Sequence, residues 1–513
     1  MFSVLQSKQR TPSEADICLI AEGCYPYVPG GVSNWIDALM RSFPELSFSV
    51  VAIIAGGGIR RSRYAFPNNL VHFQEIELHQ AGRHNRRFGK KGGSLDAPPL
   101  ARAFSDLLNS RSDDQFACIQ AIFDQMTAPS LEMLMNSPKA WEVIKLMYEQ
   151  LMPHASFHSF FWAWRALFGG LFAILKAPLP PAQIYHSVST GYAGLFAARA
   201  KLESSRPVLL TEHGIYTNER RVEILMADWI ADTIDKGLAL SDDRFDLREM
   251  WIAAFEAYAR ICYQSCDEII TLYKDNQRLQ RQLEADEKRL QIIPNGIELE
   301  RFSSLPRVGE DDRPTIALIG RIVPIKDVKS FITAAMIARN TIPDLRALVL
   351  GPDDEHPEYA QECKTLVADL DLSACVQFKG AVNIADYLPQ IHAVVLTSLS
   401  EAQPLVLLEA GSAGVPCIAT DVGSCRELLE GHADEIPLLG HGGFICDLVA
   451  PEQVAEAVIR LLQDGQLRQC CGDTLRKRVS KYYRAEQVKT AYEQLYRQYG
   501  AGACVAIHQA RAR

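Results

Sequence analysis

The sequence has no excess of positive charge. Its 53 lysines and arginines are outnumbered by 62 aspartates and glutamates, which gives a formal net charge of −9. Because neutralising nucleic-acid phosphates requires a basic face, we expect no nucleic-acid partner. This charge does not exclude the binding of a single diphosphate, since two or three local cations are enough to hold one.

The sequence also lacks the two glycine-rich motifs by which many proteins bind nucleotides. Residues 82–93, GRHNRRFGKKGG, do not form a P-loop, because six residues separate Gly82 from Gly89 and Lys91 stands where serine or threonine is needed. We interpret this basic stretch as a solvated surface loop. The pair Gly30–Gly31 does not have the G-x-G-x-x-G spacing, so a dinucleotide-binding fingerprint is not supported.

Cysteine spacing gives no zinc framework. The chain has 13 cysteines, an odd number, and several of them, such as Cys18 and Cys417, stand among apolar neighbours. This usage is typical of buried free thiols in a reducing compartment. Cys262 and Cys266 have no second pair at metal-ligand spacing, so we favour a packed helix over a metal site there.

The start of the sequence has no apolar leader, so we expect no signal peptide and a cytoplasmic protein. One apolar stretch, residues 157–175, is close to the length of about 20 residues that spans a bilayer. It contains Arg165 and the pair Gly169–Gly170 near its middle, and a central arginine is costly in a membrane. We therefore expect a buried helix or a hydrophobic docking surface.

Short apolar runs alternate with amphipathic stretches along most of the 513 residues, which exceed one ordinary domain. Runs without internal alternation are typical of parallel strands covered on both faces. Two series of them predict an α/β fold with two doubly wound, Rossmann-like domains. The first series comprises residues 16–21, 48–54, 183–188, 207–213, 267–273 and 290–296, and the second comprises residues 315–320, 345–351, 375–380, 392–398, 416–420 and 443–447.

The two series are separated by a polar stretch with two prolines and a glycine, which reads as a linker. The sequence between about residues 80 and 180 departs from the strand–helix alternation, and we expect a helical insertion there. The predicted organisation is a first domain at 1–300 that contains this insertion, a linker at 301–314, a second domain at 315–485, and a C-terminal helix at 486–513 that packs back on the first domain.

Ligands of open α/β sheets bind outside the carboxyl ends of the strands. In the first domain, Gly30–Gly31 lies before a helix that we expect to begin near Ser33, where backbone N–H groups attract an anion. A glycine pair before a helix can also be only a turn. His213 ends another predicted strand, where a structural and a functional histidine are equally consistent with the sequence.

In the second domain, Arg321 directly follows a predicted strand and Lys326 stands five residues further on. Two cations at this edge, near a helix N-terminus, suit a diphosphate. Glu401 closes the loop after another strand, Pro404 is suited to the first helical position, and Glu409 lies within the helix that follows. Carboxylates accept hydrogen bonds from vicinal hydroxyl groups, although either glutamate alone is more typical of an ordinary surface.

Five motifs occur together in a characteristic order between residues 29 and 428. In this combination the chain resembles the retaining glycosyltransferases of family 4, which have the GT-B architecture of two Rossmann-like domains facing an interdomain cleft. The opening of the chain and its helical insertion are similar to the glycosyltransferases of exopolysaccharide synthesis. The motifs are PGGVSNW, TEHG, IIPNGIELERF, LIGRIVPIKD and SEAQPLVLLEAGSAGVPCIATDVGSCREL.

The resemblance implies a role for each candidate residue. Catalytic roles fall to Glu401, which would face the transferred sugar, His213, which would lie near it, and Arg321 and Lys326, which would hold the phosphates. The donor would also contact Gly30, Gly31, Val32, the backbone of Gln403 and Leu405, and Glu409, which would bind the ribose hydroxyls. Pro404 lacks an N–H group, so no amide contact is expected there.

The resemblance further implies transfer of a hexose or N-acetylhexosamine from a UDP-sugar to a growing exopolysaccharide, with retention and without a metal ion or other cofactor. Inner-membrane components of a polysaccharide synthase would dock at about residues 150–176, at the inner face of the membrane. Two alternatives remain open: a nucleotide-sugar epimerase with the same fold, and a non-catalytic nucleotide-sugar sensor that docks to a membrane complex.

Overall fold

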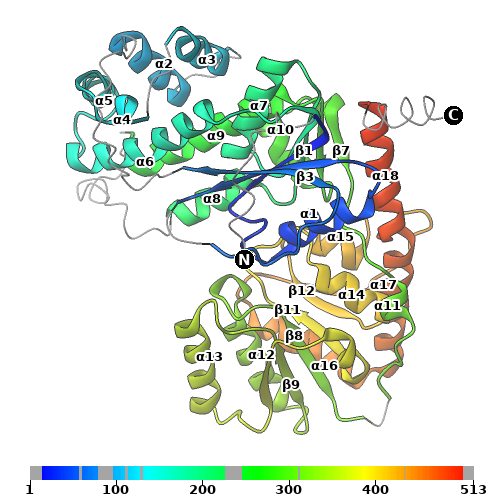
Figure 1. The fold of residues 1–513 in the computed structure, drawn as a ribbon. Coiled ribbons are helices and arrows are strands. Elements are labelled where there is room, and N and C mark those ends of the chain that lie inside the picture. The colour runs from blue at the N-terminus through cyan, green and yellow to red at the C-terminus, as the bar shows by residue number, and fades with distance from the viewer. Residues whose placement is uncertain are drawn as a thin grey trace, which may run out of the picture. The chain divides into compact units, whose positions relative to one another are not determined.

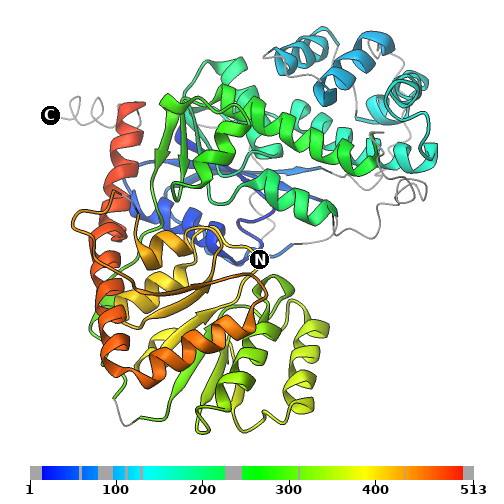
Figure 2. The same cartoon turned by 180° about the vertical axis from the view of Figure 1, so that it is seen from behind.

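The structure is a computed structural model that describes residues 14–56, 60–78, 96–109, 114–126, 131–225, 245–309, 312–432 and 434–500. The basic loop predicted at 82–93 lies outside these residues. The chain divides into two compact units, which Figures 1 and 2 show from opposite sides. The first unit contains residues up to 271, residues 277–291 and the chain from 493 onward; the second contains residues 272–276 and 292–492.

The first unit contains a seven-stranded sheet in the order β3-β2-β1-β4-β5-β6-β7. The pairs from β3 through β6 are parallel, and the order reverses between β1 and β4, as in a doubly wound sheet. The strands are β1 (Ala15–Glu22), β2 (Phe48–Ile54), β3 (Leu70–Glu77), β4 (Ala182–Ser187), β5 (Val208–Glu212), β6 (Glu268–Thr271) and β7 (Leu290–Ile292).

Strand β3 is absent from the runs predicted from the sequence. It lies at the edge of the sheet, and most of its residues are exposed or half-buried. An edge strand is not covered on both faces, so its sequence, LVHFQEIE, is not a continuous apolar run. By contrast, every residue of β2 is buried, which is why that strand is easily recognised.

Helices cover the sheet of the first unit (Figure 1). Helix α1 begins at Gly31, two residues before the position predicted from the sequence. Cys262 lies in the last turn of helix α9 and Cys266 is its C-cap; both are buried thiols, as expected for a packed helix. The helices are α1 (Gly31–Ser42), α7 (Tyr192–Ser204), α8 (Tyr216–Leu225), α9 (Leu247–Ser265) and α10 (Asn276–Gln282).

Between β3 and β4, the described residues form five helices, which make up the insertion. Figures 1 and 2 show α2 to α5 grouped together, apart from the strands. Helix α6 buries Trp164, Phe168 and Phe172 in the core but leaves the Trp162 side chain exposed. Within the described part of the chain, every helix is too short or too polar to span a bilayer. The helices are α2 (Ala97–Asn109), α3 (Gln115–Gln125), α4 (Leu131–Asn136), α5 (Pro138–Leu151) and α6 (Phe157–Lys176).

The second unit contains a parallel six-stranded sheet in the order β10-β9-β8-β11-β12-β13, which reverses between β8 and β11. Each unit thus carries the Rossmann-like α/β fold that the sequence predicts. The strands are β8 (Thr315–Ile319), β9 (Arg346–Leu350), β10 (Val376–Gly380), β11 (Ala393–Leu396), β12 (Cys417–Thr420) and β13 (Gly443–Cys446).

The helices of the second unit lie on both faces of its sheet, and the last helix runs from this unit into the first. Near its end, the Tyr496 hydroxyl lies 2.8 Å from Nδ1 of the buried His186 in β4. The helices are α11 (Glu300–Ser303), α12 (Val328–Arg339), α13 (Pro357–Asp369), α14 (Leu405–Ala413), α15 (Cys425–Glu430), α16 (Pro451–Gln463), α17 (Gly465–Tyr482) and α18 (Ala485–Gln498).

Candidate active site

The carboxyl edge of the second sheet brings a lysine and a glutamate together. Lys326 ends the short helical turn Pro324–Lys326 that follows β8, and Glu401 lies in the loop that follows β11. The lysine ammonium and the Glu401 carboxylate form an ion pair, with side chains only 19% and 14% exposed. Because water is largely excluded, this pair interacts more strongly than a surface pair would.

Two buried hydroxyl groups hold this pair in place. The Thr397 hydroxyl donates to the carbonyl oxygens of Lys326 and Asp327, at 3.0 and 2.9 Å. The Ser398 hydroxyl donates to Oε1 of Glu401 at 2.7 Å. Both residues directly follow β11. The end of this strand therefore holds both the turn that carries Lys326 and the carboxylate of Glu401. Neither hydroxyl was identified from the sequence, although both stand at the end of a predicted strand.

Two glycines allow the loops at this edge to approach one another. A Cβ atom at Gly351 would lie 1.9 Å from the carbonyl oxygen of Gly320, the residue before Arg321. Gly423 has φ +54°, and a Cβ there would lie 2.3 Å from the carbonyl oxygen of Glu401. No other residue fits at these positions without moving the backbone that carries the charged side chains.

Arg321 lies at the same edge but pairs with a different carboxylate. Its Nη1 donates to Oε1 of Glu355 at 2.7 Å, and the two side chains are 43% and 47% exposed. Glu355 stands in the loop between β9 and α13 and was not identified from the sequence. Such an exposed pair contributes little stability, so Arg321 can exchange Glu355 for another anion.

Glu409 is half-buried in α14. Burial raises the pKa of its carboxyl group to about 7, and the charge of Arg301 partly opposes this rise. Among the described residues, no side chain or backbone group donates a hydrogen bond to this carboxylate. It therefore retains its full capacity to accept bonds from paired hydroxyl groups.

The residues around the start of α14 differ from expectation in two respects. Pro404 is the N-cap, with extended backbone angles, rather than the first helical residue. The Gln403 side chain is buried, and its Oε1 accepts a hydrogen bond from the backbone N–H of Asn295 at 2.6 Å. Leu405 is the first residue of the helix, where backbone N–H groups have no intrahelical partner.

In the first unit, Gly30 is the N-cap of α1, and Gly31 and Val32 begin the helix. Gly30 has φ 169°, which is extended backbone open to any residue. A Cβ atom added at Gly30 or Gly31 would meet no other atom within 4 Å. The fold itself therefore requires no glycine at either position, and the space beside them is open to a ligand.

His213 directly follows β5 and is 8% exposed. Burial lowers the pKa of its imidazole to about 4, so the ring is neutral at pH 7. The Trp35 ring packs against it edge to face, with 4.8 Å between centroids. Among the described residues, Nε2 of His213 has no hydrogen-bond partner. A buried, neutral and unpartnered nitrogen can bond a ligand hydroxyl.

The residue before it, Glu212, is fully buried and was not singled out from the sequence. Its carboxylate accepts hydrogen bonds from the Tyr263 hydroxyl at 2.7 Å and from Nε2 of Gln280 at 2.9 Å. Burial raises the pKa of this carboxyl group. Glu212 fixes the end of β5 to α9 and α10, and thereby fixes the position of His213.

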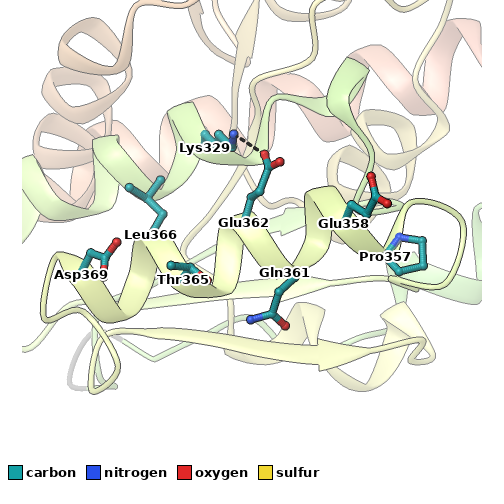
Figure 3. A pocket seen from close by; sticks show the side chains of 8 residues that line it. All are labelled: Lys329, Pro357, Glu358, Gln361, Glu362, Thr365, Leu366 and Asp369. Carbon is teal, nitrogen blue, oxygen red and sulfur yellow. Dashed lines mark hydrogen bonds and ion pairs between the residues drawn. The ribbon is translucent and has the colours of Figure 1, made fainter.

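One surface groove of the second unit does not contain these residues. It has a volume of about 640 Å³ and runs along α13. Figure 3 shows the side chains of this helix along the groove and the ion pair of Lys329 with Glu362 at its rim. The groove is an open helix face without a reacting group. Over the described ranges of the chain, no group of three or more histidine, cysteine, aspartate or glutamate residues could hold a metal ion.

The candidate residues thus fall into two sets. The second unit brings Lys326 and Glu401 into direct contact, while Arg321 and Glu409 have other surroundings at or near the same sheet edge. The Gln403 side chain accepts a hydrogen bond from the backbone N–H of Asn295. Gly30, Gly31, Val32 and His213 belong to the first unit.

Comparison with known families agrees with this architecture. Residues 303–478 match the family model described as Glycosyl transferases group 1, so the second unit is a domain of this class. Residues 15–288, more than half of the chain, match the model described as a domain of unknown function, DUF3492. The chain therefore belongs to the DUF3492 family, with a group 1 glycosyl transferase domain following the DUF3492 region.

The curated relatives match parts of the chain. N-acetyl-alpha-D-glucosaminyl L-malate synthase of Bacillus anthracis is 33% identical over 154 residues, 30% of this chain and 37% of that protein. UDP-Gal:alpha-D-GlcNAc-diphosphoundecaprenol alpha-1,3-galactosyltransferase of Escherichia coli is 26% identical over 297 residues, 55% of this chain and 66% of that protein. The chain thus spans less than two thirds of the length of these relatives.

Two solved structures resemble nearly the whole chain. Sucrose-phosphate synthase of Thermosynechococcus elongatus has a TM-score of 0.57 at 16% identity, covering 94% of this chain and 99% of its own. HepE of Anabaena in complex with UDP has a TM-score of 0.57 at 13% identity, covering 94% of this chain and 100% of its own. At this identity the likeness concerns the fold, and it confirms the predicted fold class of two Rossmann-like domains, that of GT-B glycosyltransferases.

Proposed function

We propose that this chain is a hexosyltransferase that moves a hexose or N-acetylhexosamine from a UDP-sugar to a growing exopolysaccharide. The observation that carries the proposal is the Lys326–Glu401 pair, held by Thr397 and Ser398 at the carboxyl edge of a group 1 glycosyl transferase domain. One relative is named for transfer from UDP-Gal, and HepE of Anabaena was solved with UDP and with UDP-glucose. These names favour UDP as the nucleotide.

The proposed reaction breaks the bond between the sugar and a diphosphate. Its transition state resembles an oxocarbenium ion that departs from an anionic leaving group. Lys326 and Arg321 neutralise the growing charge on the diphosphate, and Glu401 faces the positive charge that develops on the sugar. Stabilisation of this kind, by preorganised charged groups, contributes about 3–4 kcal/mol for one donor.

The remaining candidates bind the donor in this proposal. Glu409 accepts hydrogen bonds from the ribose hydroxyls, and the backbone N–H of Leu405 approaches a phosphate oxygen. His213, neutral and with an unpartnered Nε2, bonds a hydroxyl of the sugar. Gly30 and Gly31 leave open space for the diphosphate beside the start of α1.

We propose further that transfer proceeds with retention and without a metal ion or other cofactor. Lys326 and Arg321 supply the positive charge that a divalent metal supplies in other transferases. Retention without an enzyme nucleophile requires the acceptor hydroxyl to attack from the face that the leaving group vacates. The departing phosphate oxygen then accepts the proton of that hydroxyl. Each bond made and broken is accounted for without a further reactant.

The exopolysaccharide assignment rests on likeness in the first unit. The opening of the chain and the helical insertion are similar to PelF, the glycosyltransferase of Pel exopolysaccharide synthesis. We propose a cytoplasmic enzyme that meets inner-membrane synthase components through residues 150–176. In this range the Trp162 side chain, 57% exposed, is the apolar group most available to a partner. Replacing Trp162 with glutamate tests the docking, and unchanged membrane recruitment contradicts it.

The function is tested by measuring UDP release from a panel of UDP-sugars with an oligosaccharide acceptor. We expect turnover with at least one donor, and we expect the Lys326→Ala and Glu401→Gln variants to lose it. The Lys329→Ala variant should stay active, because Lys329 of α12 forms only an exposed ion pair with Glu362. Binding of GDP or ADP more tightly than UDP overturns the choice of nucleotide. A new nucleotide-sugar epimer, formed without acceptor, overturns the transferase assignment in favour of an epimerase.

A further inference from the structure

The two most exposed large apolar residues in the described part of the chain lie in one loop. This loop, residues 434–442, stands between α15 and β13 in the second unit. Ile436 is 81% exposed and Leu438 is 77% exposed, and Pro437 between them is exposed as well. Single exposed apolar residues are common on folded proteins, but three in a row form a continuous apolar surface. We call Ile436, Pro437 and Leu438 the apolar tip.

A buried ion pair holds the loop that carries the apolar tip. Nε and Nη2 of Arg478 in α17 donate to the Glu435 carboxylate at 2.8 and 2.9 Å, and both side chains are fully buried. The same carboxylate accepts a hydrogen bond from the backbone N–H of Leu439 at 3.1 Å. Arg478 also donates to the carbonyl oxygen of Gly440 at 2.6 Å. The residues on either side of the tip are therefore fixed, and the tip is presented by an ordered loop.

The surface beside the apolar tip carries positive charge. The Lys481 ammonium donates to the carbonyl oxygen of Ile436 at 2.5 Å, and Lys477 stands one turn earlier on α17. Both lysines are exposed, and within the described residues neither forms an ion pair. The exposed carboxylate of the loop, that of Asp434, pairs with Lys274 at 2.9 Å. Two cations without a neutralising partner thus border the tip, although the whole chain has a net charge of −9.

We propose that the apolar tip and these two lysines bind the surface of an anionic lipid bilayer. Apolar side chains enter the boundary between headgroups and acyl chains, and neighbouring lysines attract anionic headgroups. This surface belongs to the second unit, whereas residues 150–176 belong to the first. The proposal does not depend on the proposed function, because no nucleotide, acceptor or membrane protein takes part in it.

A protein partner fits this surface less well than a bilayer does. Specific protein–protein interfaces bury about 800 Å² on each partner, and tryptophan, tyrosine and arginine contribute most of their binding energy. The apolar tip offers three aliphatic side chains and none of these residues. A bilayer needs no extended complementary surface, since its headgroup region accommodates a small apolar projection. We therefore favour lipid as the occupant.

The test measures co-sedimentation of the full-length chain with protein-free vesicles in the absence of nucleotide. One set of vesicles contains phosphatidylcholine alone, and the other contains equal parts of phosphatidylcholine and phosphatidylglycerol. We expect binding to the anionic set, about tenfold weaker binding to the neutral set, and weaker binding at high salt. Ile436→Ser and Leu438→Ser should each weaken binding about fivefold or more, and Lys477→Gln should weaken it about threefold.

Two variants control for general surface effects. Leu202→Ser removes an apolar residue of α7 that is 47% exposed. Lys288→Gln removes an exposed lysine that, like Lys477, forms no ion pair among the described residues. Both should leave vesicle binding unchanged. Thermal unfolding checks that all five variants fold, which we expect because the replaced side chains are exposed.

The proposal is overturned if the chain does not bind anionic vesicles, if it binds neutral vesicles equally well, or if the tip variants bind as the unsubstituted chain does. Sedimentation velocity tests whether a second copy occupies the same surface. If Leu438→Ser dissociates a dimer and leaves vesicle binding unchanged, the tip is an interface between two copies and the lipid proposal is wrong.

A further variant separates this surface from the first unit. Trp162→Glu should leave binding to protein-free vesicles unchanged, because its proposed partner is a protein. Loss of vesicle binding in Trp162→Glu, together with normal binding of the tip variants, would place the lipid contact in the first unit and overturn the proposal. Failure of the proposed function is distinguishable, because it would abolish UDP release and leave vesicle binding intact.

Discussion

Lys326 and Glu401 form an ion pair across 75 residues of sequence, and both charges stand at the carboxyl edge of the second sheet. Their opposite charges neutralise one another, with Ser398 as an additional donor to the carboxylate. An anionic donor must therefore compete with Glu401 for the lysine. When it does so, Glu401 is left facing the sugar end of the donor, which is the position its proposed role requires.

Replacing Lys326 with alanine should lower kcat/KM for UDP release by a factor of about 10² to 10³, the usual effect of removing one preorganised charge-stabilising donor. The same variant should weaken UDP binding, as measured by calorimetry, because it removes one of two cations. Lys329→Ala, which breaks a similar but outward-facing pair with Glu362, serves as the control. Equal activities of the two variants would contradict the assignment of Lys326.

A second prediction concerns Glu355, the carboxylate that forms an ion pair with Arg321. Glu355 accepts a hydrogen bond from this arginine at 2.7 Å and so competes with a phosphate. Replacing Glu355 with glutamine should tighten UDP binding about two- to fivefold, in keeping with the 0.2–1 kcal/mol of a typical exposed pair. Glu362→Gln removes the similarly exposed partner of Lys329 and should leave UDP binding unchanged. Weaker UDP binding in Glu355→Gln would mean that Glu355 itself contacts the donor.

Glu409 provides a prediction about pH. Burial raises the pKa of its carboxyl group from 4.5 to about 7. Between pH 4.5 and 7, this group is therefore protonated in the folded chain and ionised in the unfolded chain. The free energy of unfolding should therefore fall as pH rises from 4.5 to 7, and this contribution should vanish in Glu409→Gln.

The same ionisation should govern ribose binding. Because the charged carboxylate is the stronger acceptor for ribose hydroxyls, the preference for UDP over 2′-deoxy-UDP should increase as pH rises through about 7. Calorimetry should measure the affinities of both nucleotides at each pH. Phosphate titration affects both affinities equally, so it does not change their ratio. A preference that is independent of pH, or one that persists in Glu409→Gln, would show that this carboxylate does not bind the ribose.

The sequence predicts most of the sheet because most strands are buried on both faces. Strands such as β2 and β8 are buried throughout and mostly apolar, so their runs are recognisable without structural information. Strand β3 escaped recognition because it lies at an edge and mixes polar with apolar residues. The start of α1 was predicted two residues late because no polar side chain caps it; glycine stands at its N-cap.

The candidate site, like the sheet, could be predicted only in part. Arg321, Lys326 and Glu401 could be placed from sequence, because each follows a recognisable strand. Their partners could not, because pairing depends on loop conformations that no local pattern encodes. The ion pair of Arg321 with Glu355 therefore could not be predicted from the sequence. The same holds for the hydrogen bond from the backbone N–H of Asn295 to the Gln403 side chain.

Thr397 should act as a positioning residue for Lys326. Its hydroxyl donates to two carbonyl oxygens of the turn that carries the lysine, so Thr397→Val leaves both without this donor. We expect a loss of about 1–3 kcal/mol in the free energy of unfolding, the cost of leaving buried acceptors unsatisfied. A lower kcat with little change in KM for the acceptor should accompany it. Thr397→Ser keeps the hydroxyl and should restore both quantities, whereas a purely steric role of the methyl group would not allow this rescue.

The last prediction concerns Gly31, the first residue of α1. Its backbone is helical, and a Cβ atom there would meet nothing within 4 Å, so Gly31→Ala should fold with no loss in the free energy of unfolding. Alanine is the better helix former, and the unfolded chain loses some of its freedom, so the variant should be equally stable or more stable. If the diphosphate approaches this turn closely, however, the added methyl group should raise KM for the UDP-sugar about tenfold or more, a cost of about 1.4 kcal/mol. Gain of stability with loss of donor affinity distinguishes a ligand-binding glycine from one required by the fold. A variant with unchanged KM would remove Gly31 from the donor site and leave the open space beside α1 without a known occupant.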